Sequence, residues 1–120
     1  MENKEENQAA IFEQICEVND LDPQVIRAEA KHNNNRKHGP GENIDRLIRT
    51  AFRHRANELV AELDISSSNS VEEGKEYQAD GDPAAPSFTI NEAYIRTKYS
   101  EAEAKQIIAA LGRVQLPIQS

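Results

Sequence analysis

A long apolar stripe in the middle of the chain most constrains its fold. Between Glu42 and Asp64 no glycine or proline occurs, and apolar residues recur every three or four positions: Ile44, Leu47, Ile48, Ala51, Phe52, Ala56, Leu59, Val60 and Leu63. This is the spacing of one face of an α-helix. It predicts a helix over about residues 42–64 that other elements bury, and this helix should be the centre of the fold.

Two shorter helices are expected before it. Apolar residues at helical spacing predict a helix over residues 5–18. Asp22 followed by Pro23 is typical of an N-cap and a first helical position, because the missing N–H of proline costs nothing there. A second helix should therefore run from Pro23 to about residue 33. The asparagine- and glycine-rich stretch 33–41, with its proline, predicts a loop.

The second half of the chain is less apolar. Residues 66–87 are acidic and contain almost nothing apolar except Val71 and Tyr77. Burial of so little apolar surface cannot offset the entropy lost on ordering, so a flexible linker is predicted. Residues 88–90 suggest a short extended piece. Ser100 with Glu103 forms a capping box that predicts a helix over 101–111, ending at Gly112 and preceded by a shorter helical turn over 92–99.

These elements predict an all-α fold. It consists of a helical core domain (1–65), an acidic flexible linker (66–87) and a C-terminal helical segment (88–120), within the size of one domain. Large apolar side chains are scarce, which favours completion of the core in a homodimer. The C-terminal segment must dock on its own chain, a second copy or another protein, through Tyr94, Ile95, Tyr99, Ile107, Ile108 and Leu111.

The charge is distributed unevenly. The chain has a net charge of −7, yet residues 27–55 carry eight Lys and Arg against three acids, with all three histidines. The segments on either side of this stretch are strongly acidic. Such asymmetry is typical of a surface that binds a polyanion or an acidic protein.

The first two helices and their short turn resemble a helix-turn-helix, over about residues 11–31. Three positions depart from that motif: Asn19, Asp20 and Glu29. An ordinary αα-hairpin is the alternative, and we favour it. If the motif is present, the second helix presents Gln24, Arg27 and Lys31 to the major groove of DNA. The four places that the motif reserves for apolar or small residues hold Ile15, Cys16, Leu21 and Ile26.

Three arginines of the long helix, Arg46, Arg49 and Arg53, lie three and four residues apart and therefore on one face. With Arg36 and Lys37 of the preceding loop they could contact several phosphates. Two alternatives remain: a solvated helix face, or a surface that pairs with the acidic linker of the same chain. That linker is interpreted mainly as a tether, and alternatively as a segment that covers the arginines until nucleic acid displaces it.

The sequence gives little support for catalysis. His32, His38 and His54 are far apart and Cys16 has no second thiol nearby, so we predict no metal site, no cofactor and no catalytic residue. The lone cysteine, and the absence of a signal peptide or a long apolar segment, predict a cytoplasmic protein without a membrane partner. The leading prediction is a non-enzymatic nucleic-acid-binding regulator, with duplex DNA favoured. The alternative is a protein-binding adaptor or inhibitor.

Overall fold

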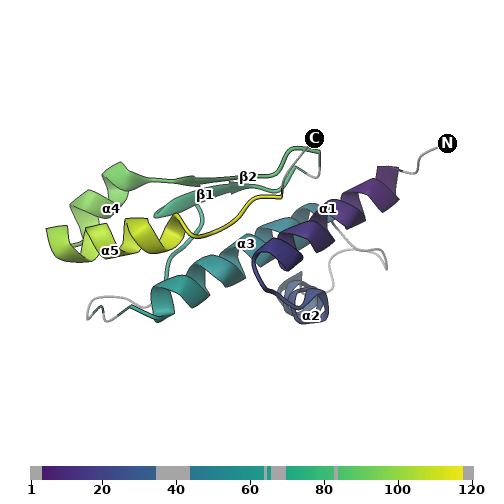
Figure 1. Cartoon of the computed structure of the whole chain (residues 1–120), viewed down its shortest axis with the longest axis horizontal. Coiled ribbons are helices and arrows are strands. Elements are labelled where there is room, and N and C mark those ends of the chain that lie inside the picture. The colour runs from purple at the N-terminus through teal and green to yellow at the C-terminus, as the bar shows by residue number, and fades with distance from the viewer. Residues whose placement is uncertain (1–3, 35–43, 64, 66–69, 83, 118–120) are drawn as a thin grey trace.

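The computed structural model of the chain describes residues 4–34, 44–63, 65, 70–82 and 84–117. In this part the chain forms five helices and one antiparallel pair of strands (Figure 1). The elements are, in order, α1 (Lys4–Val18), α2 (Pro23–Asn34), α3 (Ile44–Ala61), β1 (Tyr77–Asp80), β2 (Ser87–Ile90), α4 (Glu92–Lys98) and α5 (Glu101–Leu111).

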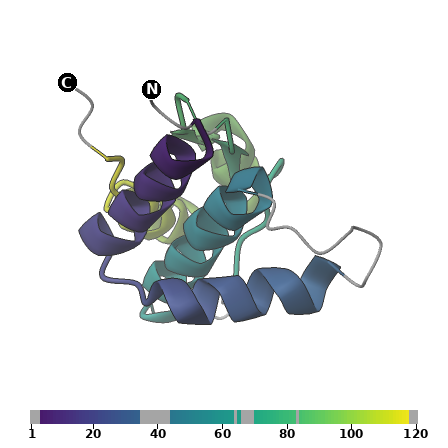
Figure 2. The ribbon, with the colours of Figure 1, turned by 90° about the vertical axis from the view of Figure 1, so that its right-hand side faces the viewer.

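Helix α3 is the centre of the fold, as the apolar stripe predicts. It contacts α1, α2, α5 and β1. Its side chains Ile48, Ala51 and Phe52 are completely buried. Figure 2 shows α1 running beside α3 and α2 crossing both, while Figure 1 shows the two strands and the α4–α5 pair on the side of α3 away from α2. A helix that carries apolar residues over so wide a face can be covered from several sides.

The predicted helix ends are confirmed by their caps. The Asp22 carboxylate accepts a hydrogen bond from the Gln24 N–H at 2.9 Å, and α2 begins at Pro23. The Ser100 hydroxyl accepts from the Glu103 N–H at 3.2 Å, and α5 ends before Gly112. These side chains satisfy N–H groups that a helix leaves unpaired in its first turn.

The all-α prediction is wrong, and within the flexible linker predicted over 66–87 the described residues 77–80 and 87 belong to strands. Residues 77–80 pair with 87–90 in an antiparallel hairpin, with Tyr77 opposite Ile90 and Ala79 opposite Phe88. Residues 66–69 and 83 lie outside the described residues. Strand β1 alternates buried and exposed residues, so a low apolar content suffices for one buried face. The fold is therefore mixed α/β, with Val71, Tyr77 and Ala79 in its core.

The hairpin packs on α3 through aromatic rings. The Tyr77 and Phe88 rings stack with centroids 4.8 Å apart, and Phe88 lies 5.7 Å from Phe52 of α3. Gly81, which follows β1, has room for no side chain, because an added Cβ would lie 2.6 Å from the Asp45 carbonyl oxygen of α3. Offset aromatic contacts of this kind add to the stabilisation from burial.

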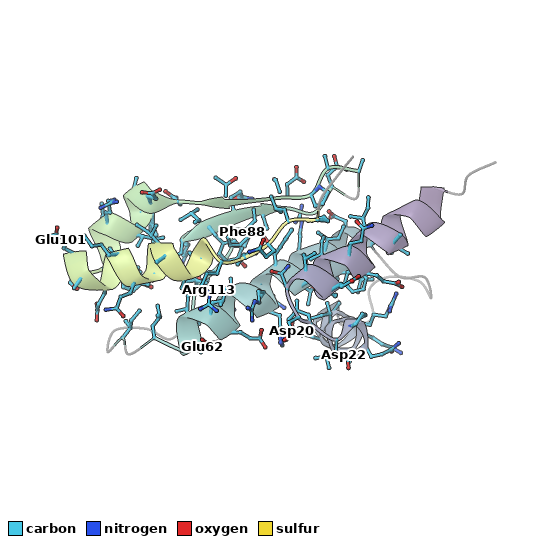
Figure 3. All side chains as sticks on the ribbon, viewed as in Figure 1. Asp20, Asp22, Glu62, Phe88, Glu101 and Arg113 are labelled. Atoms are coloured by element: carbon cyan, nitrogen blue, oxygen red, sulfur yellow. The ribbon has the colours of Figure 1, made fainter. Side chains whose placement is uncertain are left out.

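The C-terminal segment docks on its own chain. Of the six residues predicted to bind a partner, four are buried in the common core (Ile95, Tyr99, Ile107 and Leu111), while Tyr94 and Ile108 are half-buried. The chain then returns to the α1–α2 turn, where the buried Asn19 amide donates to the Gln115 carbonyl at 2.9 Å and accepts from its N–H at 2.7 Å. Near the same end, Arg113 and Glu62 approach to 3.9 Å (Figure 3).

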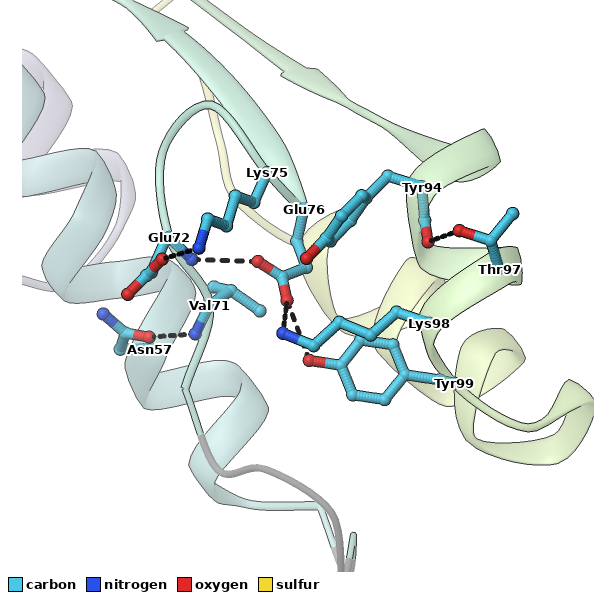
Figure 4. Close-up of polar contacts among 9 residues, drawn as sticks. All are labelled: Asn57, Val71, Glu72, Lys75, Glu76, Tyr94, Thr97, Lys98 and Tyr99. Atoms are coloured by element: carbon cyan, nitrogen blue, oxygen red, sulfur yellow. Dashed lines mark hydrogen bonds and ion pairs between the residues drawn. The ribbon is translucent and has the colours of Figure 1, made fainter.

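A buried carboxylate connects the residues before β1 to α4. Glu76 is 1% exposed, and its carboxylate accepts hydrogen bonds from the Glu72 N–H at 3.1 Å, the Lys98 ammonium at 3.1 Å and the Tyr99 hydroxyl at 2.8 Å (Figure 4). Burial raises the pKa of this carboxyl, but the hydrogen bonds outweigh burial and lower the pKa below its ordinary value. Glu76 is therefore ionised at neutral pH and holds two elements together.

None of the described helices combines the length and the apolar character that crossing a bilayer requires.

Candidate functional site

A pocket of about 630 Å³ lies between α3 and the segment 70–73. Helix α3 forms one wall and the segment that precedes the hairpin forms the other. Both walls are mainly polar. The residues that line the pocket are Asp45, Arg46, Arg49, Thr50, Arg53 and Asn57 of α3, and Ser70, Val71, Glu72 and Glu73 of the segment.

The α3 wall contains the three arginines that the sequence predicts on one face: Arg46, Arg49 and Arg53. Arg49 lies 3.7 Å from Asp45, with its side chain 49% exposed, and Arg53 lies 3.8 Å from Glu29 of α2, with its side chain 42% exposed. Both distances exceed those of charge-assisted hydrogen bonds, and solvent-exposed ion pairs of this kind contribute little. The guanidinium groups of Arg49 and Arg53 therefore remain able to bind an anion.

The opposite wall is held on α3 by an amide. The Asn57 side chain accepts a hydrogen bond from the Val71 N–H at 2.7 Å, and Val71 is 2% exposed (Figure 4). Glu72 pairs with Lys75 at 3.0 Å, whereas the half-buried Glu73 carboxylate makes no hydrogen bond or ion pair within the described part of the chain. Neither Asn57 nor Glu73 is predicted from the sequence as a site residue, because Glu73 and Val71, the partner of Asn57, both fall in the expected linker 66–87.

A buried hydroxyl lies close to the charges of the pocket. Tyr77 is completely buried, and its hydroxyl has no hydrogen-bond partner among the residues that the structure describes. Burial raises the pKa of Tyr77, the Glu73 carboxylate raises it further, and the Arg53 guanidinium opposes both. The phenol is therefore neutral at any physiological pH.

The residues predicted on α2 do not line the pocket. Gln24 and Lys31 are exposed on the helix surface. Arg27 is half-buried, approaches Glu13 of α1 to 3.8 Å and lies over the Phe12 ring at 5.2 Å from its centroid. Arg36 and Lys37 lie outside the described residues. The eight predicted nucleic-acid contacts thus divide into three pocket residues, three residues on α2 and two that the structure does not place.

Helices α1 and α2 follow one another through a short turn, and each of them packs on α3. Ile15, Cys16 and Ile26 are completely buried, and Leu21 packs against the core. Glu29 is half-buried, and its carboxylate approaches Arg53 to 3.8 Å and His54 to 3.4 Å, so it connects α2 to α3. Of the four residues that match the helix-turn-helix pattern, three are therefore fully buried and the fourth is partly buried.

Reactive groups are few in the described part of the chain. Burial raises the pKa of the Cys16 thiol to about 11, so the thiol is protonated at neutral pH and buried away from solvent. Across residues 4–34, 44–63, 65, 70–82 and 84–117, no three histidine, cysteine or acidic side chains gather closely enough to hold a metal ion.

No protein-family model, curated protein or solved structure matches this chain. An assignment of function therefore depends on the chemistry of the pocket and its surroundings.

Proposed function

We propose that the protein is a small, non-enzymatic nucleic-acid-binding regulator that works in the cytoplasm. The observation that carries this proposal is the gathering of Arg46, Arg49 and Arg53 on one wall of a single open pocket. A guanidinium group matches a phosphate geometrically and can donate two parallel hydrogen bonds to it. The lone, buried Cys16 suits a reducing compartment.

The charge of the rest of the molecule supports the same proposal. The chain is acidic overall, with a net charge of −7, while residues 27–55 are basic. A polyanion is repelled by most of this surface and attracted by one region, which orients the encounter. Lys31, exposed on α2, extends the attraction beyond the pocket, so that more than one phosphate can be neutralised at once. Arg36 and Lys37 add two positive charges to the same stretch of the sequence.

Salt dependence of binding tests the proposal. Affinity for a labelled 20-nucleotide duplex and for its single strand is measured by fluorescence anisotropy between 50 and 200 mM NaCl. The slope of log affinity against log salt is negative, and each lost phosphate contact makes it less steep by about 0.9 for duplex and about 0.7 for single strands. The double variant Arg49→Gln/Arg53→Gln should make the slope less steep by the equivalent of about two contacts.

A matched double variant controls for net charge. Arg96 of α4 and Lys105 of α5 are exposed cations outside the pocket, paired with Glu92 at 3.3 Å and Glu101 at 3.9 Å. Arg96→Gln/Lys105→Gln removes the same charge and should change affinity by less than about 2-fold. Equal losses in the two double variants, or no binding by the wild-type protein at 50 mM NaCl, would contradict the proposal.

An acidic protein surface is the second candidate partner. The α3 arginines already approach carboxylates, Arg49 that of Asp45 and Arg53 that of Glu29, and a guanidinium group binds carboxylate as readily as phosphate. In this case the protein is an adaptor or inhibitor. If the partner is an acidic protein, poly-glutamate should bind more tightly than an oligonucleotide of equal charge. If the partner is a nucleic acid, the oligonucleotide should bind more tightly.

A further inference from the structure

The arginines lie on a concave surface. Elements that read duplex DNA protrude into a groove, the major groove being about 12 Å wide. Here Arg46, Arg49 and Arg53 are on the wall of a pocket, and the segment 70–73 stands opposite them. A duplex cannot bring its grooves around a recessed wall, but an unpaired nucleotide can enter the pocket. The volume of about 630 Å³ falls within the range of small-ligand sites, about 300–1,000 Å³.

The two walls differ in what they can recognise. The α3 wall offers guanidinium donors, whereas Glu73 offers carboxylate oxygens that can only accept. The other acids of the pocket have cationic neighbours: Glu72 has Lys75 at 3.0 Å, and Asp45 has Arg49 at 3.7 Å. Glu73 is half-buried and has no such neighbour within the described residues. A ligand that satisfies both walls carries an anionic group at one end and paired N–H donors at the other.

Among the nucleobases, guanine meets the second requirement best. Its Watson–Crick edge presents a ring N–H beside an amino group, two parallel donors that fit the two oxygens of one carboxylate. Adenine and cytosine present one amino group beside a ring acceptor, and uracil and thymine present one N–H between two carbonyl oxygens. A carboxylate repels these acceptors. We propose that the pocket holds one guanine nucleotide of a single-stranded nucleic acid, with its phosphate at Arg49 and Arg53 and its base at Glu73.

This inference rests on the proposed function and is tested separately from it. Anisotropy is measured with labelled octamers of thymidine in which the central base is guanine, adenine, cytosine or thymine, with the RNA counterparts in uridine, and with the corresponding duplexes. The guanine octamer should bind about 10-fold more tightly than the other three, since a bidentate pair discriminates by about 5- to 150-fold. The DNA and RNA series show which sugar is preferred.

A glutamate of the pocket and one outside it give a matched pair of variants. Glu73→Gln removes the acceptor pair and should reduce the guanine preference to less than about 2-fold, whereas Glu101→Gln should retain it, because Glu101 is exposed on α5 and does not line the pocket. Circular dichroism checks that both variants are folded.

The outcomes separate the two claims. Equal affinity for all four central bases, equal loss in both glutamate variants, or tighter binding of the duplexes overturns this inference and leaves nucleic-acid binding standing. Absence of binding to every oligonucleotide overturns both.

Discussion

Replacing the buried Glu76 by glutamine tests how the hairpin is held to α4. The carboxylate accepts hydrogen bonds from the Glu72 N–H, the Lys98 ammonium and the Tyr99 hydroxyl at 2.8–3.1 Å. Glutamine keeps one acceptor oxygen and has an NH₂ group in place of the other. That NH₂ group faces an N–H or O–H donor and cannot accept a hydrogen bond from it. Glu76→Gln therefore loses one buried bond to a charged acceptor, and it also loses the charge that holds Lys98.

The magnitude follows from the exposure of each partner. A hydrogen bond to a charged group contributes about 1.5–3 kcal/mol when it is buried. The Lys98 side chain is 42% exposed, so its contribution is screened to about 0.5–1 kcal/mol. The free energy of unfolding of Glu76→Gln should thus be lower than that of the wild type by about 2–4 kcal/mol, measured by urea unfolding at pH 7.

Lowering the pH should reduce this difference. Because the folded-state pKa of Glu76 is below the ordinary value of 4.5, its carboxylate stabilises the fold above that value, and the stabilisation is lost as the pH falls through the folded pKa. The control Glu101→Gln changes an 85% exposed side chain and should change stability by less than about 0.5 kcal/mol. Two results would contradict this role of Glu76. In one, Glu76→Gln changes the free energy of unfolding at pH 7 as little as Glu101→Gln does. In the other, the effect of Glu76→Gln stays the same well below pH 4.5.

Three further changes test the packing. Gly81→Ala should destabilise the protein by about 1–3 kcal/mol, because its Cβ would overlap α3. Gly112→Ala should be near neutral, because the nearest atoms to its Cβ are 3.4 Å away. Thermal unfolding compares the two variants. Tyr77→Phe removes a buried hydroxyl without a partner in the described residues and should stabilise by about 1 kcal/mol in urea unfolding; a loss would reveal a partner. Asn19→Ala should cost about 2 kcal/mol and speed amide exchange at Gln115; unchanged exchange would contradict the predicted role.

The helices could be predicted because their signals are local. Apolar spacing identifies α3, and the capping side chains Asp22 and Ser100 mark the starts of α2 and α5. The hairpin could not be recognised by counting apolar residues, because a four-residue strand with one buried face needs only Tyr77 and Ala79 on that face. The alternation over residues 77–80, followed by Gly81, was the available signal.

Only one wall of the candidate site could be predicted from the sequence. Arg46, Arg49 and Arg53 share a helix, so their spacing alone places them on one face. The opposite wall depends on a tertiary contact between Asn57 and Val71, 14 positions apart, which no local pattern encodes. The role of Glu73 depends on that contact in turn.

A titration followed by amide NMR spectra shows whether nucleic acid binds at the pocket. Uniformly ¹⁵N-labelled protein is titrated with the guanine octamer at 50 mM NaCl, and chemical shifts are mapped by residue. We expect the largest changes at residues 45–57 and 70–73, which form the walls of the pocket. Changes confined to α4 and α5, or a spectrum that the octamer leaves unaltered, would contradict the assignment of the arginine-lined pocket as the nucleic-acid site.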